Sequence, residues 1–188
     1  MKSSKEVAEY FKENKRGIVF FYDSIDDYAT SRFLMNNGFL REGLIFGSQA
    51  IEKMLKTFIL LTQGKFPKKD WDGHNLLPLR EELKKTSDLN LDKYSKLLKR
   101  LSKDYRAKYM EENLDRNKAS WELKEIDELY LFLVENLSII DGLKYITRFF
   151  QYLFSKNAQD NYASAIKENN DSLKNKISKF KTKWEEFQ

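Results

Sequence analysis

The stretch at residues 40–64, LREGLIFGSQAIEKMLKTFILLTQG, decides the fold of this protein. Its large apolar residues recur at spacings of three and four, which is typical of an α-helix with one buried face: Leu44, Ile51, Met54, Leu55, Phe58 and Leu61. We predict a helix at 40–63 that Gly64 ends. Gly43 and Gly47 each cost about 1 kcal/mol inside a helix relative to alanine. Together with Ala50 they indicate a close approach of another helix, either within the chain or across the seam of a dimer.

The flanking segments have helical periodicity as well, and only seven Gly and two Pro interrupt them. We predict further helices at about 4–15, 24–37, 74–85, 91–113 and 120–154, and we expect Gly17 to end the first. The one strand-like run, residues 18–22, is too short and isolated to form a sheet, so we interpret it as the start of a buried helix. Asp23 or Ser24 then caps the next helix. Asp141 and Gly142 are expected to kink or split the last one.

The C-terminal segment has its own pattern. Its apolar residues follow a heptad-like spacing of four and three: Tyr162, Ile166, Leu173, Ile177, Phe180, Trp184 and Phe187, with Asn169 or Asn170 in the same register. We predict an amphipathic helix over 161–188 that either docks on the rest of the protein or faces a partner. Residues 157–188 form a C-terminal extension of a single helical domain over 1–188.

Composition excludes several kinds of chemistry. The chain has no cysteine and a single histidine, His74, so thiolate catalysis, cysteine-ligated zinc and sites with two histidines from one chain are excluded. We predict no metal and no cofactor. The net charge of +5 comes mostly from lysine, with 26 Lys and 8 Arg, and permits contact with phosphate groups without demanding it. No apolar run is long enough to span a membrane, so we expect a soluble cytoplasmic protein.

An ordered series of short motifs resembles a known family. Residues 27–38 read DYATSRFLMNNG, residues 49–56 read QAIEKMLK, and residues 74–79, HNLLPL, open the next helix. These resemble the AxxxLxxxG helix, the QxAxEKxLK helix and the short His-Asp-Leu helix of the HEPN (higher eukaryotes and prokaryotes nucleotide-binding) domain family. Residues 104–109 resemble the family's tyrosine-and-arginine segment, with Lys108 and Met110 in place of its arginine and proline. The resemblance covers about residues 18–146.

The resemblance implies an all-α, antiparallel bundle of four to five core helices, commonly paired as a homodimer. To this core the sequence adds an extra N-terminal helix and the C-terminal amphipathic helix. Some family members are RNA-cleaving toxins or defence ribonucleases, some accompany small nucleotidyltransferases, and others bind without known chemistry. The ribonucleases resemble one another in an arginine followed, four to six residues later, by a histidine. His74 has Lys68 and Lys69 at that distance, and no arginine.

We therefore predict a non-catalytic HEPN-type module, without a catalytic residue, that pairs as a homodimer. It binds a nucleotide, RNA or a protein partner such as a nucleotidyltransferase, in a defence or toxin–antitoxin setting. An atypical ribonuclease using His74 is one alternative, and a protein-interaction adaptor acting through the C-terminal helix is another. The candidate residues for nucleotide or RNA binding are Lys53, Lys56, His74, Lys96, Arg100, Lys103, Arg106 and Tyr109, and the candidate dimer seam is Gly43, Gly47 and Ala50.

Each candidate residue also has a purely structural interpretation. Glu52 and Lys56 are four residues apart in the order that favours a salt bridge on a helix surface. His74 stands at a helix start, where its side chain can cap backbone donors or pack under Trp71. Lys96, Lys99, Arg100, Lys103 and Arg106 form a basic helix face, which suits either solvent or a phosphate backbone.

Overall fold

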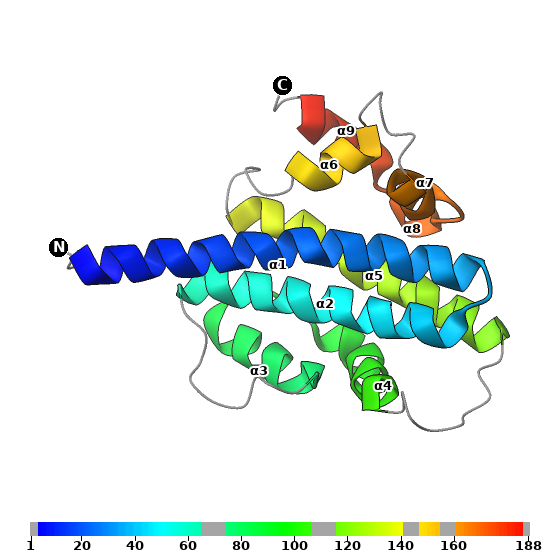
Figure 1. The fold of residues 1–188 in the computed structure, drawn as a ribbon, viewed down its shortest axis with the longest axis horizontal. Helices are drawn as coiled ribbons and strands as arrows, with labels where there is room; N and C mark the ends of the chain where they lie inside the picture. The colour runs from blue at the N-terminus through cyan, green and yellow to red at the C-terminus, as the bar shows by residue number, and fades with distance from the viewer. Residues whose placement is uncertain (1–3, 65–73, 107–115, 141–146, 155–160, 186–188) are drawn as a thin grey trace.

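The computed structural model describes residues 4–64, 74–106, 116–140, 147–154 and 161–185 (Figure 1). None of the residues in these ranges belongs to a strand, so the predicted all-α class is confirmed. The elements in chain order are α1 (Ser4–Asn36), α2 (Leu40–Gln63), α3 (Leu76–Thr86), the 3-10 turn η1 (Asp92–Tyr94), α4 (Ser95–Arg106), α5 (Arg116–Ile140), α6 (Thr147–Phe154), α7 (Asn161–Lys167), α8 (Asp171–Lys174) and α9 (Ile177–Glu185).

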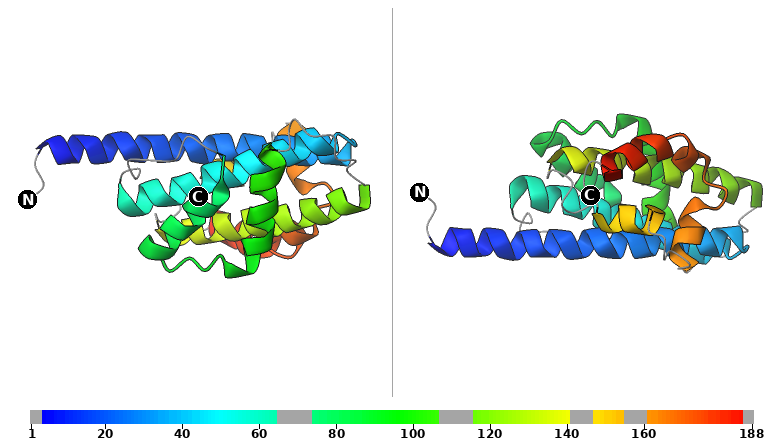
Figure 2. Two further views of the ribbon diagram at one scale, coloured as in Figure 1. Left: turned by 90° about the horizontal axis from the view of Figure 1, so that it is seen from below. Right: turned by 90° about the horizontal axis from the view of Figure 1, so that it is seen from above.

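The bundle is built around α1, α2 and α5. Helices α1 and α2 lie side by side in opposite directions, and α5 packs against both of them (Figures 1 and 2). Helices α3 and α4 pack on α2 at one side of the bundle, whereas α6–α9 lie at the opposite side, over α1 and α5. The first part of α1 extends beyond the other helices (Figure 2). Within the described ranges, the search for a helix long and apolar enough to cross a membrane found none.

The predicted central helix is confirmed at both ends, because α2 spans Leu40–Gln63. Gly64 follows it in the left-handed conformation, with φ at 67°, and its N–H donates a hydrogen bond to the Leu60 carbonyl. This bond satisfies one of the carbonyl groups that a helix leaves without a partner at its end. Of the predicted apolar stripe, Leu61 is half-buried and the other residues are buried in the core.

Two predicted long helices are described only in part. The helix predicted over 120–154 corresponds to α5, which ends at Ile140, and α6, which begins at Thr147; Asp141 and Gly142, where a kink or split was expected, lie outside the described residues. The helix predicted over 91–113 consists of η1 followed by α4, and the residues after Arg106 lie outside the described ranges.

The prediction that Gly17 ends a first helix is wrong, because α1 continues through it to Asn36. A Cβ atom at Gly17 would lie 3.4 Å from Leu60 Cβ, and Thr57 Oγ1 donates a hydrogen bond to the Gly17 carbonyl over 3.2 Å. The glycine therefore serves the packing of α1 on α2 rather than chain termination. Ser24 is likewise inside α1 and caps no helix, since its Oγ donates to the Phe21 carbonyl of the preceding turn.

The C-terminal segment forms three short helices in place of the single helix predicted. Asn169 has a positive φ of 50°, and Asn170 caps α8 by accepting a hydrogen bond from the Leu173 N–H over 2.8 Å. These two asparagines therefore interrupt the helix. The apolar stripe nevertheless docks on the bundle of the same chain, with Ile166, Leu173 and Phe180 each at most 1% exposed.

Candidate functional site

Two of the predicted binding residues, Lys56 and His74, contact one buried carboxylate, that of Glu52 on α2, and a third, Lys53, follows Glu52 on the same helix. Lys56 lies one turn further along α2, and its Nζ is 2.6 Å from Glu52 Oε1. His74, which precedes α3, places Nδ1 2.9 Å from Glu52 Oε2. Lys53 forms a neighbouring ion pair, with Nζ 2.6 Å from Oδ2 of Asp27 on α1. We call these five residues the Glu52 cluster.

The start of α3 determines where His74 lies. Asn75 caps α3 by accepting a hydrogen bond from the Leu77 N–H. His74 therefore precedes the cap residue, whereas the sequence had suggested that His74 itself can cap the helix. Leu76 is fully buried, and its N–H donates to Oγ of Ser102 on α4 over 3.0 Å. These contacts fix the first turn of α3 and bring His74 back against α2. Trp71, the other predicted neighbour of His74, lies outside the described residues.

Burial and charge define what the Glu52 cluster can bind. The side chain of Glu52 is 8% exposed, whereas those of Lys56, Lys53 and His74 are 15%, 27% and 46% exposed. A carboxylate ion is a hydrogen-bond acceptor only, so its contact with His74 assigns the imidazole proton to Nδ1. A buried anion thus holds a lysine and an imidazole that both reach solvent.

In the second ion pair of the cluster, between Lys53 and Asp27, the surroundings disfavour the charged form of the acid. Burial raises the pKa of Asp27 above the ordinary aspartate value, although the hydrogen bond and charge of Lys53 oppose this effect. Desolvation of the carboxylate therefore costs more than Lys53 returns. Lys53 is the more exposed of the two lysines, with 27% of its side chain accessible against 15% for Lys56.

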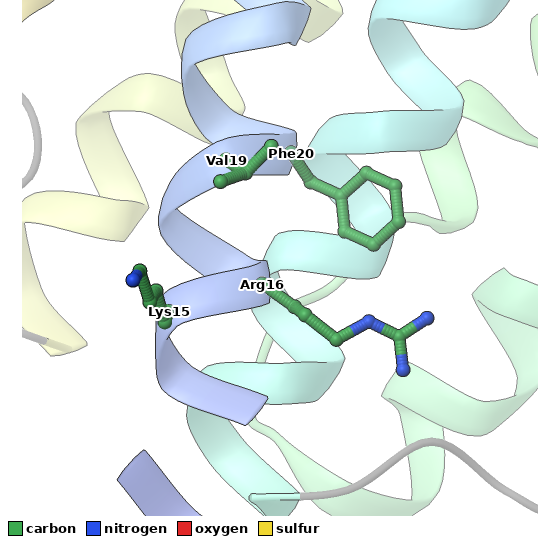
Figure 3. A pocket seen from close by; sticks show the side chains of 4 residues that line it. All are labelled: Lys15, Arg16, Val19 and Phe20. Carbon is green, nitrogen blue, oxygen red and sulfur yellow. The ribbon is translucent and has the colours of Figure 1, made fainter. Parts of the chain in front are cut away.

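An aromatic side chain and a pocket adjoin the cluster. The ring centroid of Phe20 on α1 lies 5.8 Å from Lys56 Nζ. Phe20 also lines a pocket of about 320 Å³ together with Lys15, Arg16 and Val19 (Figure 3). Arg16 and Phe20 point to the same side of α1 in this view. Phe20 was not among the predicted binding residues, because its place in a continuous apolar run indicated only a core residue.

The other predicted basic residues do not join the cluster. Lys96 of α4 is exposed, and Arg100 is bound to Glu122 and Glu125 of α5, so its charge is compensated there. The side chains of Lys103 and Arg106, and all of Tyr109, lie outside the described residues. The predicted basic face of α4 is therefore interrupted at Arg100 by the acids of α5.

The candidate dimer seam is buried inside one chain. A Cβ atom at Gly43 would lie 2.2 Å from Met35 Cγ of α1, and one at Gly47 would lie 2.9 Å from Ile126 Cδ1 of α5. Ala50 is fully buried. The close approach that these small residues indicated is thus made by α1 and α5 of the same chain, and a dimer through them stays a prediction.

The fold and the cluster together describe a helical domain in which α2 carries two lysines, and the histidine that precedes α3 lies against the same helix. The family model of the HEPN domain matches residues 20–137, from the middle of α1 to near the end of α5. The chain belongs to the HEPN domain family, as the sequence motifs had predicted. A search of the curated proteins found no match to the chain, and a search of the solved structures found none either.

Proposed function

We propose that the protein is a non-catalytic HEPN module that binds a phosphate group of a nucleotide or an RNA strand at the Glu52 cluster. The observation that carries this proposal is the contact of Lys56 and His74 with the Glu52 carboxylate, with Lys53 three residues before Lys56 on α2. The lysine ammonium groups are suitable donors to a phosphate oxygen. The Glu52 carboxylate holds Lys56 and the imidazole in place, and the imidazole donates to a phosphate from Nε2 when the ring carries both protons. Phe20 beside Lys56 adds a ring against which a base can stack.

Binding without cleavage is the better interpretation of this set of residues. Cleavage of RNA at the 2′-hydroxyl requires a base, an acid and a cation positioned on the phosphate. The chain offers one imidazole, and it lacks the arginine that precedes the histidine in the nuclease members of the family. Lysine is a flexible point charge and holds phosphate less rigidly than the planar guanidinium group.

The test of binding compares two lysines of equal charge in different places. Wild-type protein, Lys53→Ala and Lys96→Ala are titrated with a panel of nucleotides and with a labelled single-stranded RNA. We expect Lys53→Ala to weaken binding about tenfold, as loss of about 1.4 kcal/mol does, and Lys96→Ala to leave the affinity within about twofold. The opposite ranking would place the ligand on α4, and the absence of any binding would refute the proposal.

A second candidate function is an atypical ribonuclease that uses His74. It is favoured by one observation, the contact of Glu52 with Nδ1, because a carboxylate in that position orients an imidazole and strengthens it as a general base. Incubation of the purified protein with RNA tests it directly. Cleavage that disappears in His74→Ala supports the enzyme, whereas intact RNA with the wild type rejects it.

We further propose that the protein acts as a homodimer, since members of the family commonly pair, and that its setting is defence or a toxin–antitoxin system. Light scattering at several protein concentrations tests the pairing. A nucleotidyltransferase encoded beside this protein, and its capture by the purified chain, would identify a protein partner. The adaptor alternative receives no support, because Ile166, Leu173 and Phe180 of the C-terminal stripe are buried in the chain itself.

A further inference from the structure

A fully buried arginine lies between the HEPN core and the C-terminal segment. Arg32 of α1 is 0% exposed and is the largest of the fully buried side chains among the described residues. Its Nη1 binds Asp127 Oδ2 on α5, and Tyr28 Oη donates to the other oxygen, Asp127 Oδ1, over 2.7 Å. Both oxygens of Asp127 are thus occupied, and the guanidinium group is held in one orientation.

The other edge of the guanidinium group is covered by the C-terminal segment. Nε donates to the Ala165 carbonyl over 2.9 Å, and Nη2 donates to the Glu168 carbonyl. Ala165 lies in the last turn of α7, and Glu168 is the residue that follows this helix. Asn170 adds a hydrogen bond from its Nδ2 to Tyr28 Oη over 2.9 Å. The segment therefore satisfies Arg32 with neutral backbone acceptors.

The Nε–Nη2 edge is suited to a different ligand. Two parallel N–H groups of arginine match the spacing of two oxygens of a phosphate, and hydrogen bonds between charged groups are about twice as strong as those to neutral acceptors. Asp127 compensates the charge of Arg32, so attraction at this edge depends on its directed donors. Lys124, one turn before Asp127, adds a cation on the same helix face.

The segment carries an acid that the charges of the core influence. A hydrogen bond from Lys174 lowers the pKa of the Asp171 carboxyl on α8, and the charges of Lys124 and Arg32 lower it further. Two cations of the core thus attract a carboxylate of the segment.

The segment is built in a way that favours separate opening. Its helices have seven, four and nine residues, well below the roughly 12–15 residues at which an isolated helix is even marginally stable. Its outer contacts are ion pairs near the surface, such as those of Lys176 and Lys179 with Glu135. Units of this kind open at a lower free energy than a paired core such as α1 and α2.

We propose that residues 161–185 form a strap that covers a latent phosphate-binding site at the Nε–Nη2 edge of Arg32, and that this strap opens as a unit. Closed, the carbonyl groups of Ala165 and Glu168 occupy the edge. Open, the edge accepts a phosphate group, and Lys124, one turn before Asp127 on α5, adds a positive charge to this part of the core. The site uses residues other than the Glu52 cluster, so it does not depend on the proposed function.

Hydrogen exchange of the full chain tests the strap. Arg32→Lys keeps the charge but removes the two-donor edge, and Arg80→Lys, in the ion pairs of Arg80 with Glu81 and Asp92, is the matched control. In Arg32→Lys we expect amides of 161–185 to exchange at least about tenfold faster, while those of α2 keep their rate. The control should match the wild type. Equal acceleration in α2, or none in the strap, would show that the segment is part of the cooperative core and overturn the proposal.

Phosphate binding is then measured on an opened strap. Ile166→Asp places a charge at a fully buried position and should release the strap, with circular dichroism confirming that the bundle is folded. We expect phenyl phosphate to bind more tightly to this variant than to the wild type, and about tenfold more weakly once Arg32→Lys is added. Equal binding with and without Arg32→Lys overturns the site. If Ile166→Asp does not fold, Leu173→Asp repeats the test. Lys53→Ala is added to the variants with and without Arg32→Lys, so that a difference between them does not come from Lys53 of the Glu52 cluster.

Discussion

Replacing Gly43 with alanine should destabilise the protein, whereas the same replacement at Gly17 should stabilise it. Both glycines lie inside helices, so each change gains about 1 kcal/mol of helix propensity. The surroundings differ. At Gly17 the nearest atom to a new Cβ is Leu60 Cβ at 3.4 Å, an ordinary contact, so we expect a net gain of about 0.5–1 kcal/mol.

At Gly43 a new Cβ would meet Met35 Cγ at 2.2 Å and two backbone atoms of α1, the Ser31 carbonyl oxygen at 3.0 Å and the Met35 nitrogen at 3.1 Å. The methionine side chain can move, but the backbone of α1 cannot move without separating the two helices. That separation also strains the hydrogen bond from Ser31 Oγ to the Gly43 carbonyl. Overpacking costs about 1–3 kcal/mol and loss of the Ser31 hydrogen bond about 1 kcal/mol. After the gain of about 1 kcal/mol in helix propensity, we expect a net loss of about 1–3 kcal/mol.

Urea unfolding followed by far-UV circular dichroism measures both variants, and the two midpoints should move in opposite directions. The loss in Gly43→Ala should be the same at low and high protein concentration, because the contact is made within one chain. A loss that grows on dilution would instead place Gly43 in a dimer seam. The packing argument is refuted if Gly43→Ala is as stable as the wild type, or if both variants shift equally.

Two further predictions concern buried hydroxyl groups and pH. Tyr28→Phe removes a hydrogen bond to buried Asp127 and should cost about 1–3 kcal/mol in urea unfolding. Tyr130→Phe removes a 3.0 Å hydrogen bond with Ser24 Oγ and should cost about 1 kcal/mol or less, because Ser24 keeps its bond to the Phe21 carbonyl. Burial alone would raise the pKa of Glu135, but hydrogen bonds from two lysines at the start of α9 outweigh it and lower the pKa below the ordinary 4.5. This contact therefore contributes its full stabilisation above the ordinary pKa of glutamate, and the contribution is lost as the pH falls through the lower pKa of the folded protein. We expect hydrogen exchange of the α9 amides to accelerate in that pH range in the wild type and not in Glu135→Gln.

Local pattern determined the central helix and the family. The three- and four-residue spacing around Ile51 and Phe58 indicates which face of α2 is buried, and Gly64 ends the helix because it adopts a left-handed conformation without strain. The motif order that resembles the HEPN family was confirmed by the family model over residues 20–137. These are properties of neighbouring residues, so one sequence contains them.

One missed feature did leave a signal in the sequence. Phe21, Ile25, Tyr28, Arg32 and Met35 follow spacings of four and three, and all are buried. A charged residue in the register of a core stripe indicates a buried ion pair, since an isolated buried charge is too costly. The periodicity could have singled out Arg32, but it does not name the partner.

The sequence by itself therefore determined the all-α class, the central helix α2 with its buried face, and the family. Only the tertiary structure decided which residues meet: Glu52 with His74, Arg32 with Asp127, and Gly17 with Leu60. The physical reason is that periodicity reports whether a side chain is removed from water, whereas its partner depends on how separate helices pack. For the same reason the roles of Gly17 as a packing residue and of the C-terminal stripe as a folded strap became clear only in three dimensions.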